Sequence, residues 1–171
     1  MLGLGVGAGQ GDSLLRLHAN AYACPPGTTA GPPVTLRGLS LPTIVAESGG
    51  PPRFLATMPV TFEAMQQRVV ELPRSDIEPD GFFLITGGSG DGFWRLNGHM
   101  HEYAPPGGDP MMHRVELNGE CPPASLDAVL RSMGWPECPL AFELVQEAVT
   151  LDEPAFRRWA AAGDDSTGVE D

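Results

Sequence analysis

Two groups of side chains in this sequence have residue types and spacing that could carry chemistry, and the first is a cysteine. Cys121 follows Asn118-Gly119-Glu120 and stands a few residues before Ser125, where a helix is expected to begin. A helix N-terminus lowers the pKa of a nearby thiol, and the thiolate is the nucleophilic form of cysteine. The acidic neighbours Glu120 and Asp127 oppose that effect. Cys121 is therefore a candidate nucleophile, and a packing role is the alternative.

The second group is a set of histidines. His99 and His101 alternate on an expected strand, which places both imidazoles on one face of a sheet, and imidazole is a common zinc ligand. His113 lies on the next expected strand and is the natural third ligand. However, the odd-numbered positions of 111–117 are otherwise apolar, so His113 is predicted to face the other side. The sequence thus predicts a two-histidine pair, His99 and His101, as the candidate metal ligands, and it predicts no cofactor.

Three expected strands must position these residues. The segments 82–86, 93–103 and 111–117 are bounded by glycine- and proline-rich turns, which is typical of an antiparallel meander over about residues 82–118. The loop Gly87-Gly88-Ser89-Gly90-Asp91-Gly92 follows a strand, as a phosphate-binding loop does. It leads into another strand and contains no lysine, so we interpret it as a hairpin turn.

Four helices are expected around the meander, at about residues 61–72, 125–133, 139–149 and 153–162. Thr61, Ser125 and Asp152 are the expected N-caps. In the second helix an apolar stripe that includes Leu130 should pack on the inner face of the meander. In the third segment, Leu140, Phe142 and Leu144 also fit a strand, but its length and glutamates favour a helix. The fold class predicted is α+β.

The remaining segments are irregular in composition. Residues 1–12 are rich in glycine and are expected to be flexible. Residues 13–58 contain short β-like runs between proline-glycine turns, so they form either part of the sheet or a separate irregular arm. Residues 13–162 are predicted to form a single domain, and the acidic tail 163–171 is expected to be disordered.

Composition excludes several classes of partner. All ten basic side chains are arginine, and the formal net charge is −12. Scattered arginines among twenty-two carboxylates cannot form the basic stripe that nucleic acid or an anionic membrane requires. The three cysteines lie far apart without a CxxC motif, which favours reduced thiols and a cytoplasmic protein. Absence of lysine fits either a GC-rich genome or a chain kept free of reactive amines.

The order of the expected elements resembles that of ubiquitin-conjugating (E2) enzymes. From Thr61 to Ala162 the chain has a helix, an antiparallel meander, Cys121 and further helices. This resemblance implies a thiol-dependent transferase of a ubiquitin-like conjugation system with Cys121 as the acceptor, and a lysine-free chain could not acylate itself. The His-Pro-Asn motif of that family is missing, because Arg114 and Val115 follow His113.

We expect a non-catalytic protein-interaction module, such as an adaptor, immunity-type or accessory protein of a bacterial operon. Its partner is another protein or a second copy, to which the proline-rich arm could add an edge strand. One alternative is the E2-like transferase that uses Cys121. The second alternative is a metal-binding protein that uses His99 and His101.

Overall fold

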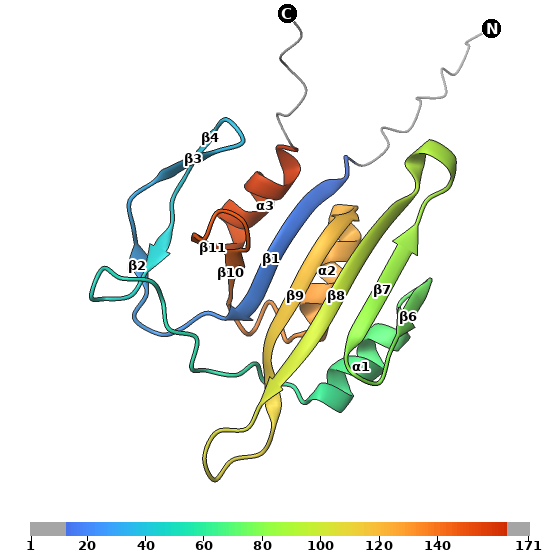
Figure 1. Ribbon diagram of the computed structural model, residues 1–171, viewed down its shortest axis with the longest axis horizontal. Coiled ribbons are helices and arrows are strands. Elements are labelled where there is room, and N and C mark those ends of the chain that lie inside the picture. Colours follow the sequence, from blue (N-terminus) through green and yellow to red (C-terminus); the bar gives the residue numbers. More distant parts are fainter. Residues whose placement is uncertain (1–12, 164–171) are drawn as a thin grey trace, which may run out of the picture.

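The computed structural model describes residues 13–163 and has an α+β fold. A seven-stranded antiparallel sheet has the order β11-β10-β1-β9-β8-β7-β6 (Figure 1). Its strands are β1 (Leu15–Ala23), β6 (Ser75–Ile77), β7 (Phe82–Gly87), β8 (Trp94–Tyr103), β9 (Met111–Cys121), β10 (Leu140–Leu144) and β11 (Thr150–Asp152). The expectations for residues 1–12 and for the tail from residue 164 concern parts of the chain outside the described residues.

The predicted meander is confirmed and is longer than expected. Strands β6, β7, β8 and β9 are consecutive neighbours, and β9 continues to Cys121. The glycine loop between β7 and β8 forms a short 3-10 turn, Gly90–Gly92, as expected of a hairpin connection. Along β8, Leu96 and Met100 are buried while Arg95 is exposed, so the predicted two faces of this strand are confirmed.

The N-terminal part of the described chain supplies a central strand. β1 pairs with β9 from Leu15↔Cys121 to Tyr22↔Arg114, and it pairs with β10 on its other side. The residues of β1 on the helix side are small or apolar and almost fully buried. β1 therefore lies between the meander and the C-terminal strand β10, which do not pair with each other directly.

The predicted helix over residues 139–149 is wrong. The segment Leu140–Leu144 is strand β10, and the chain then turns through Ala148, whose φ is 56°, into β11. The alternation of Leu140, Phe142 and Leu144 decided the structure because β1 offers this segment a partner strand. Phe142 then stacks on Phe156 with the ring centroids 4.0 Å apart.

Three helices are present among residues 13–163: α1 (Phe62–Val70), α2 (Pro123–Ser132) and α3 (Glu153–Ala161). Thr61 and Asp152 cap α1 and α3 as predicted, each accepting a hydrogen bond from the backbone N–H of the third residue of its helix. Ser125 does not cap α2, because this helix begins earlier, at Pro123, whose missing N–H needs no partner. None of the helices in the described part of the chain is long and apolar enough to cross a membrane.

Between β1 and α1 the chain forms two small two-stranded sheets. They pair β2 with β5 and β3 with β4; the strands are β2 (Thr29–Ala30), β3 (Val34–Leu36), β4 (Leu39–Leu41) and β5 (Ile44–Val45). The turn between β3 and β4 contacts α3, where the Arg37 guanidinium lies 3.9 Å from the centre of the Trp159 ring. After β5, the chain returns to the large sheet, where Phe54 stacks on Tyr22 with the ring centroids 3.9 Å apart. This part of the chain therefore packs against α3 at one place and against the large sheet at another.

One hydrophobic core lies between the sheet and the helices. The predicted stripe of α2 is buried, and Leu130 is 0 % exposed in the same cluster as Leu96 and Met100. Phe83 reaches this core by lying across Gly98 on the neighbouring strand, where a Cβ atom would be 2.0 Å from its ring. The core is thus continuous from the meander to the helices.

Candidate functional site

The helices cover only one face of the large sheet. α2 lies behind β8 and β9 in Figure 1, and α3 contacts β1 and β10 from the side on which Phe142 meets Phe156. Strand register places alternate residues on the opposite side, away from the helices. We call this side the open face. Its side chains come from β7 (Phe82, Leu84, Thr86), β8 (Arg95, Asn97, His99, His101), β9 (Arg114, Glu116, Asn118, Glu120), β1 (Arg16, His18, Asn20, Tyr22) and β10 (Glu143).

The formal charges of the open face cancel, unlike those of the whole chain. Three arginines on this face balance three glutamates, whereas the chain has a formal net charge of −12. Arg16 Nε lies 3.1 Å from Glu120 Oε1 across β1 and β9. Asn20 donates a hydrogen bond of 3.3 Å to Glu143. The face is therefore polar and locally neutral, and the acidity of the protein lies elsewhere.

The structure brings His113 to the open face, contrary to the prediction. β8 and β9 lose register after His101↔Arg114, because the next pair is Glu102↔Met112 and leaves His113 as the extra residue of a β-bulge. Met112 takes the buried position instead. The His113 ring lies 5.5 Å from that of Tyr22, and its Nε2 is 2.6 Å from the carbonyl oxygen of Phe54.

His99 and His101 are neighbours as predicted, with their ring centroids 4.3 Å apart. Burial lowers the pKa of His101, and the positive charge of Arg114 and the neighbouring His99 lower it further. Among residues 13–163, no group of three or more histidine, cysteine or acidic side chains is placed to hold a metal ion. Structural zinc sites take four protein ligands and catalytic sites take three, so the described part of the chain offers this pair no complete site.

Cys121 ends β9 just before α2, as the sequence indicated, but it points into the core. The residue is 0 % exposed, and burial raises the pKa of its thiol to about 12; a hydrogen bond with the backbone of Leu126 and the charge of Arg157 only partly oppose this. A thiol in this state is neither ionised near neutral pH nor accessible to a substrate. The geometry therefore gives no support to the E2-like alternative, in which Cys121 is the acceptor thiol.

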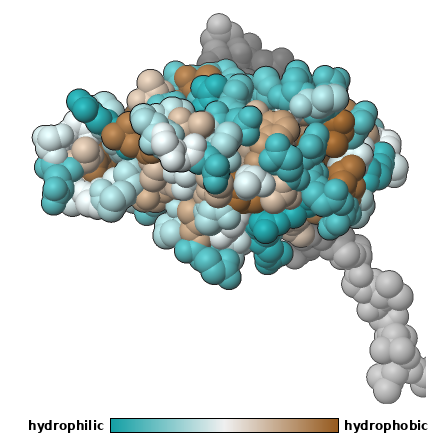
Figure 2. Space-filling view, turned by 90° about the horizontal axis from the view of Figure 1, so that it is seen from below, coloured by the Kyte–Doolittle hydropathy of each residue, from teal (hydrophilic) through white to brown (hydrophobic). Residues whose placement is uncertain are grey.

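The open face also has shallow hollows and exposed rings. Two depressions of about 290 and 550 Å³ share Arg95, Asn97 and Asn118 in their walls. Phe82 and Phe93 line one hollow each and are 37 % and 49 % exposed. Figure 2, turned by 90° from the view onto the open face, shows that hydrophobic patches on the lower side of the molecule are also small and separated by hydrophilic residues. A partner would therefore meet a mixed surface with a few aromatic contacts.

Sequence reasoning missed the contribution of β1 to this face. Arg16, His18, Asn20 and Tyr22 lie on the open face, and no function was assigned to any of them. The signal was present, because the intervening Leu15, Leu17, Ala19 and Ala21 are all apolar and predict one buried face of a strand. This alternation does not show which strands pair with β1.

Comparisons with protein-family models, with curated proteins and with solved structures found no match for this chain. The order of elements agrees with the E2 resemblance from α1 through β9 to α2. After α2 the chain forms the strands β10 and β11 before α3, and β1 lies beside β9.

Proposed function

We propose that this protein is a non-catalytic protein-interaction module, an adaptor, immunity-type or accessory protein, that binds a protein partner through the open face. The observation that carries the proposal is one face of a seven-stranded sheet that helices of the described chain leave uncovered; Phe54 packs on it at Tyr22 and His113, so its accessible part lies over β7, β8 and the rest of β9. A rigid scaffold fixes the side chains of such a face, so binding orders few groups and loses little entropy.

The composition of the open face supports a protein partner. Protein interfaces are enriched in aromatic residues and arginine and are depleted in lysine. The face combines Phe82 and Phe93 with three arginines, and the whole chain has no lysine. The acidity of the protein and the lack of a basic stripe argue against nucleic acid as the partner.

The edges of the sheet are less suitable for binding than its face. Both edge strands, β6 and β11, have only three residues, and short edge strands limit pairing with another chain. β2 and β5 already pair with each other, so this part of the chain is not a free strand. The three cysteines are free, which supports a reducing compartment such as the cytoplasm.

Two matched variants test the proposal. Asn97→Arg places a long charged side chain at the centre of the open face, whereas Gln67→Arg makes the same addition on the exposed side of α1. Size-exclusion chromatography with light scattering and pull-down from the native host would be run on the parent and on both variants. We expect a partner, or a second copy, that Gln67→Arg retains and Asn97→Arg loses. Retention by both variants, or a monomer without any partner, would contradict the proposal.

A further inference from the structure

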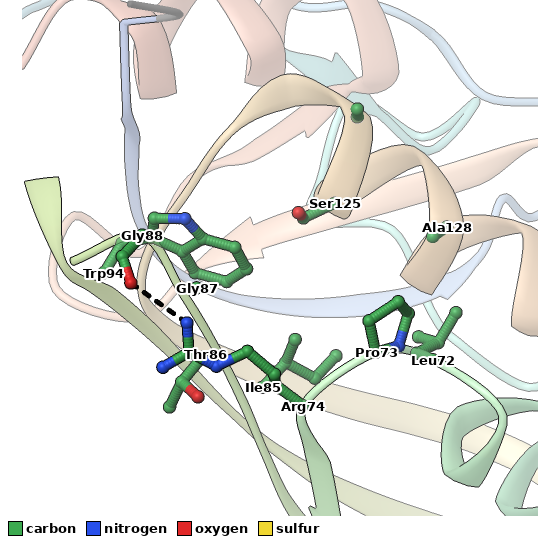
Figure 3. Close-up of a pocket in the computed structure, with 11 residues that line it drawn as sticks. Leu72, Pro73, Arg74, Ile85, Thr86, Gly87, Gly88, Trp94, Ser125 and Ala128 are labelled. Atoms are coloured by element: carbon green, nitrogen blue, oxygen red, sulfur yellow. Dashed lines mark hydrogen bonds between the residues drawn. The ribbon is translucent and has the colours of Figure 1, made fainter.

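A separate cavity lies on the helix side of the sheet, away from the open face. It has a volume of about 350 Å³ and lies between the end of α1, the adjoining ends of β7 and β8, and the first turns of α2 (Figure 3). Ligand pockets commonly measure about 300–1,000 Å³ and are lined mainly by apolar groups. Most residues around this cavity are apolar, including Leu72, Ile85, Trp94 and Ala128. Its size suits a molecule of one or two rings better than a segment of protein.

The wall formed by Trp94 depends on a glycine. Gly87 pairs with Trp94 across β7 and β8, and a Cβ atom on Gly87 would lie 2.2 Å from the indole ring. Because Gly87 has no side chain, the indole lies directly over the strand and forms one side of the pocket (Figure 3). The pocket is therefore already formed, with a flat aromatic surface.

The formal charge around this pocket is positive. Arg74 is the single charged residue among those that line it, although the chain has twenty-two acidic side chains and only ten arginines. Arg74 forms no ion pair with any of residues 13–163. An arginine guanidinium has five donors, and Arg74 uses one nitrogen, Nη1, to donate to the carbonyl oxygen of Gly88 at 2.9 Å. The remaining donors are available to an anion.

Arg74 has a costly backbone conformation that hydrogen bonds hold in place. Its φ is 54°, in the left-handed region that residues other than glycine rarely adopt. The N–H of Thr86 donates to its carbonyl oxygen at 3.2 Å, so both its backbone and its guanidinium are tied to the end of β7. The strain of such conformations is often retained at binding sites. Here the hydrogen bonds with Gly88 and Thr86 fix the positive charge of Arg74 at the edge of an apolar cavity.

The start of α2 adds polar groups on the other side. Ser125 lies in the first turn, and its hydroxyl points toward the Trp94 indole (Figure 3). No side chain caps this helix in the described structure, so the partial positive charge of its first turn adds to the positive potential of the cavity. This contribution is secondary to that of Arg74.

We propose that this pocket binds a small molecule with a flat apolar body and one carboxylate, an aromatic carboxylic acid. The ring packs against Trp94 and Ala128, and the carboxylate accepts hydrogen bonds from Arg74. Charge-assisted bonds from arginine to carboxylate are about twice as strong as neutral ones. This inference is independent of the proposed partner of the open face.

A matched pair of probes tests it by titration calorimetry with the full chain: 2-naphthoate and its uncharged analogue 2-naphthamide. The parent protein should bind the acid with a Kd below about 1 mM and about tenfold more tightly than the amide, a difference of the size that one charged contact gives. Arg74→Gln should abolish this preference by weakening binding of the acid alone. Arg95→Gln removes the same charge beside Trp94, on the opposite face of the sheet, and should change neither affinity.

A second variant tests the cavity itself. Ala128→Leu fills the pocket from α2 and should weaken binding of both probes; if it unfolds by circular dichroism, the Arg74→Gln result decides. In a ¹⁵N spectrum the indole N–H signal of Trp94 should shift on binding, and that of the buried Trp159 should not. Absence of saturation by the parent, equal affinity for acid and amide, or equal effects of Arg74→Gln and Arg95→Gln would overturn the proposal.

Discussion

Leu130 provides the most direct test of how the helices are held on the sheet. It is 0 % exposed and belongs to the apolar stripe of α2 that faces the core. Burial of a leucine side chain contributes about 2 kcal/mol from its apolar area alone. Truncation to alanine also leaves a cavity, so Leu130→Ala should lower the free energy of unfolding by about 2–5 kcal/mol. The free energy of unfolding of a typical domain is about 5–15 kcal/mol, so this variant would lose much of its stability.

Urea denaturation followed by circular dichroism measures this loss. With a slope of about 2 kcal/mol per M, the midpoint should fall by about 1–2.5 M while the slope stays the same. Arg131→Ala is the matched control, because it truncates the exposed neighbour on the same helix and should shift the midpoint far less. A midpoint for Leu130→Ala equal to that of the parent would show that α2 does not pack as described.

Three further predictions concern single groups. Cys121 is buried and its pKa is raised to about 12, so an aromatic disulfide reagent at pH 8 should react with the other two cysteines of the folded protein and with Cys121 only in denaturant. Rapid reaction of all three thiols would contradict the burial of Cys121. The pKa of His101 should lie below its ordinary 6.5 in an NMR titration, and Arg114→Gln should raise it. The unfolded chain then binds a proton at His101 more readily than the folded chain, so the free energy of unfolding falls as the pH drops below about 6.5. Urea titrations at pH 5 and pH 7 should show a smaller fall for His101→Gln than for the parent. Gly98→Ala puts a methyl group 2.0 Å from the buried ring of Phe83, so it should cost roughly 1–3 kcal/mol in the same urea assay, and an unchanged midpoint would show that the ring can move away.

Local patterns were sufficient for much of the fold. The meander, the caps Thr61 and Asp152 and the buried stripe of α2 follow from alternation, side-chain hydrogen bonding and helical period, each of which involves neighbours in the sequence. The same patterns placed His99 and His101 on one face of β8. Such features need no knowledge of the rest of the molecule.

The candidate sites were harder to predict, because each depends on a single structural detail or on distant segments. The bulge that turns His113 to the open face is one extra residue in β9, and alternation alone cannot reveal it. The pocket beside Trp94 is formed by three segments, and its charge comes from Arg74, which the sequence shows only as one residue of a polar linker.

The sequence by itself determined the composition of the protein: an acidic, lysine-free α+β chain with alternating strands and capped helices. Only the tertiary structure decided that 140–144 is a strand, that β1 lies at the centre of the sheet and that Cys121 is buried. The physical reason is that these outcomes depend on pairing across long separations, such as Ala19↔Leu144, and on the burial that this pairing creates. A residue cannot be known to be buried, ionised or accessible until the segments that cover it are in place.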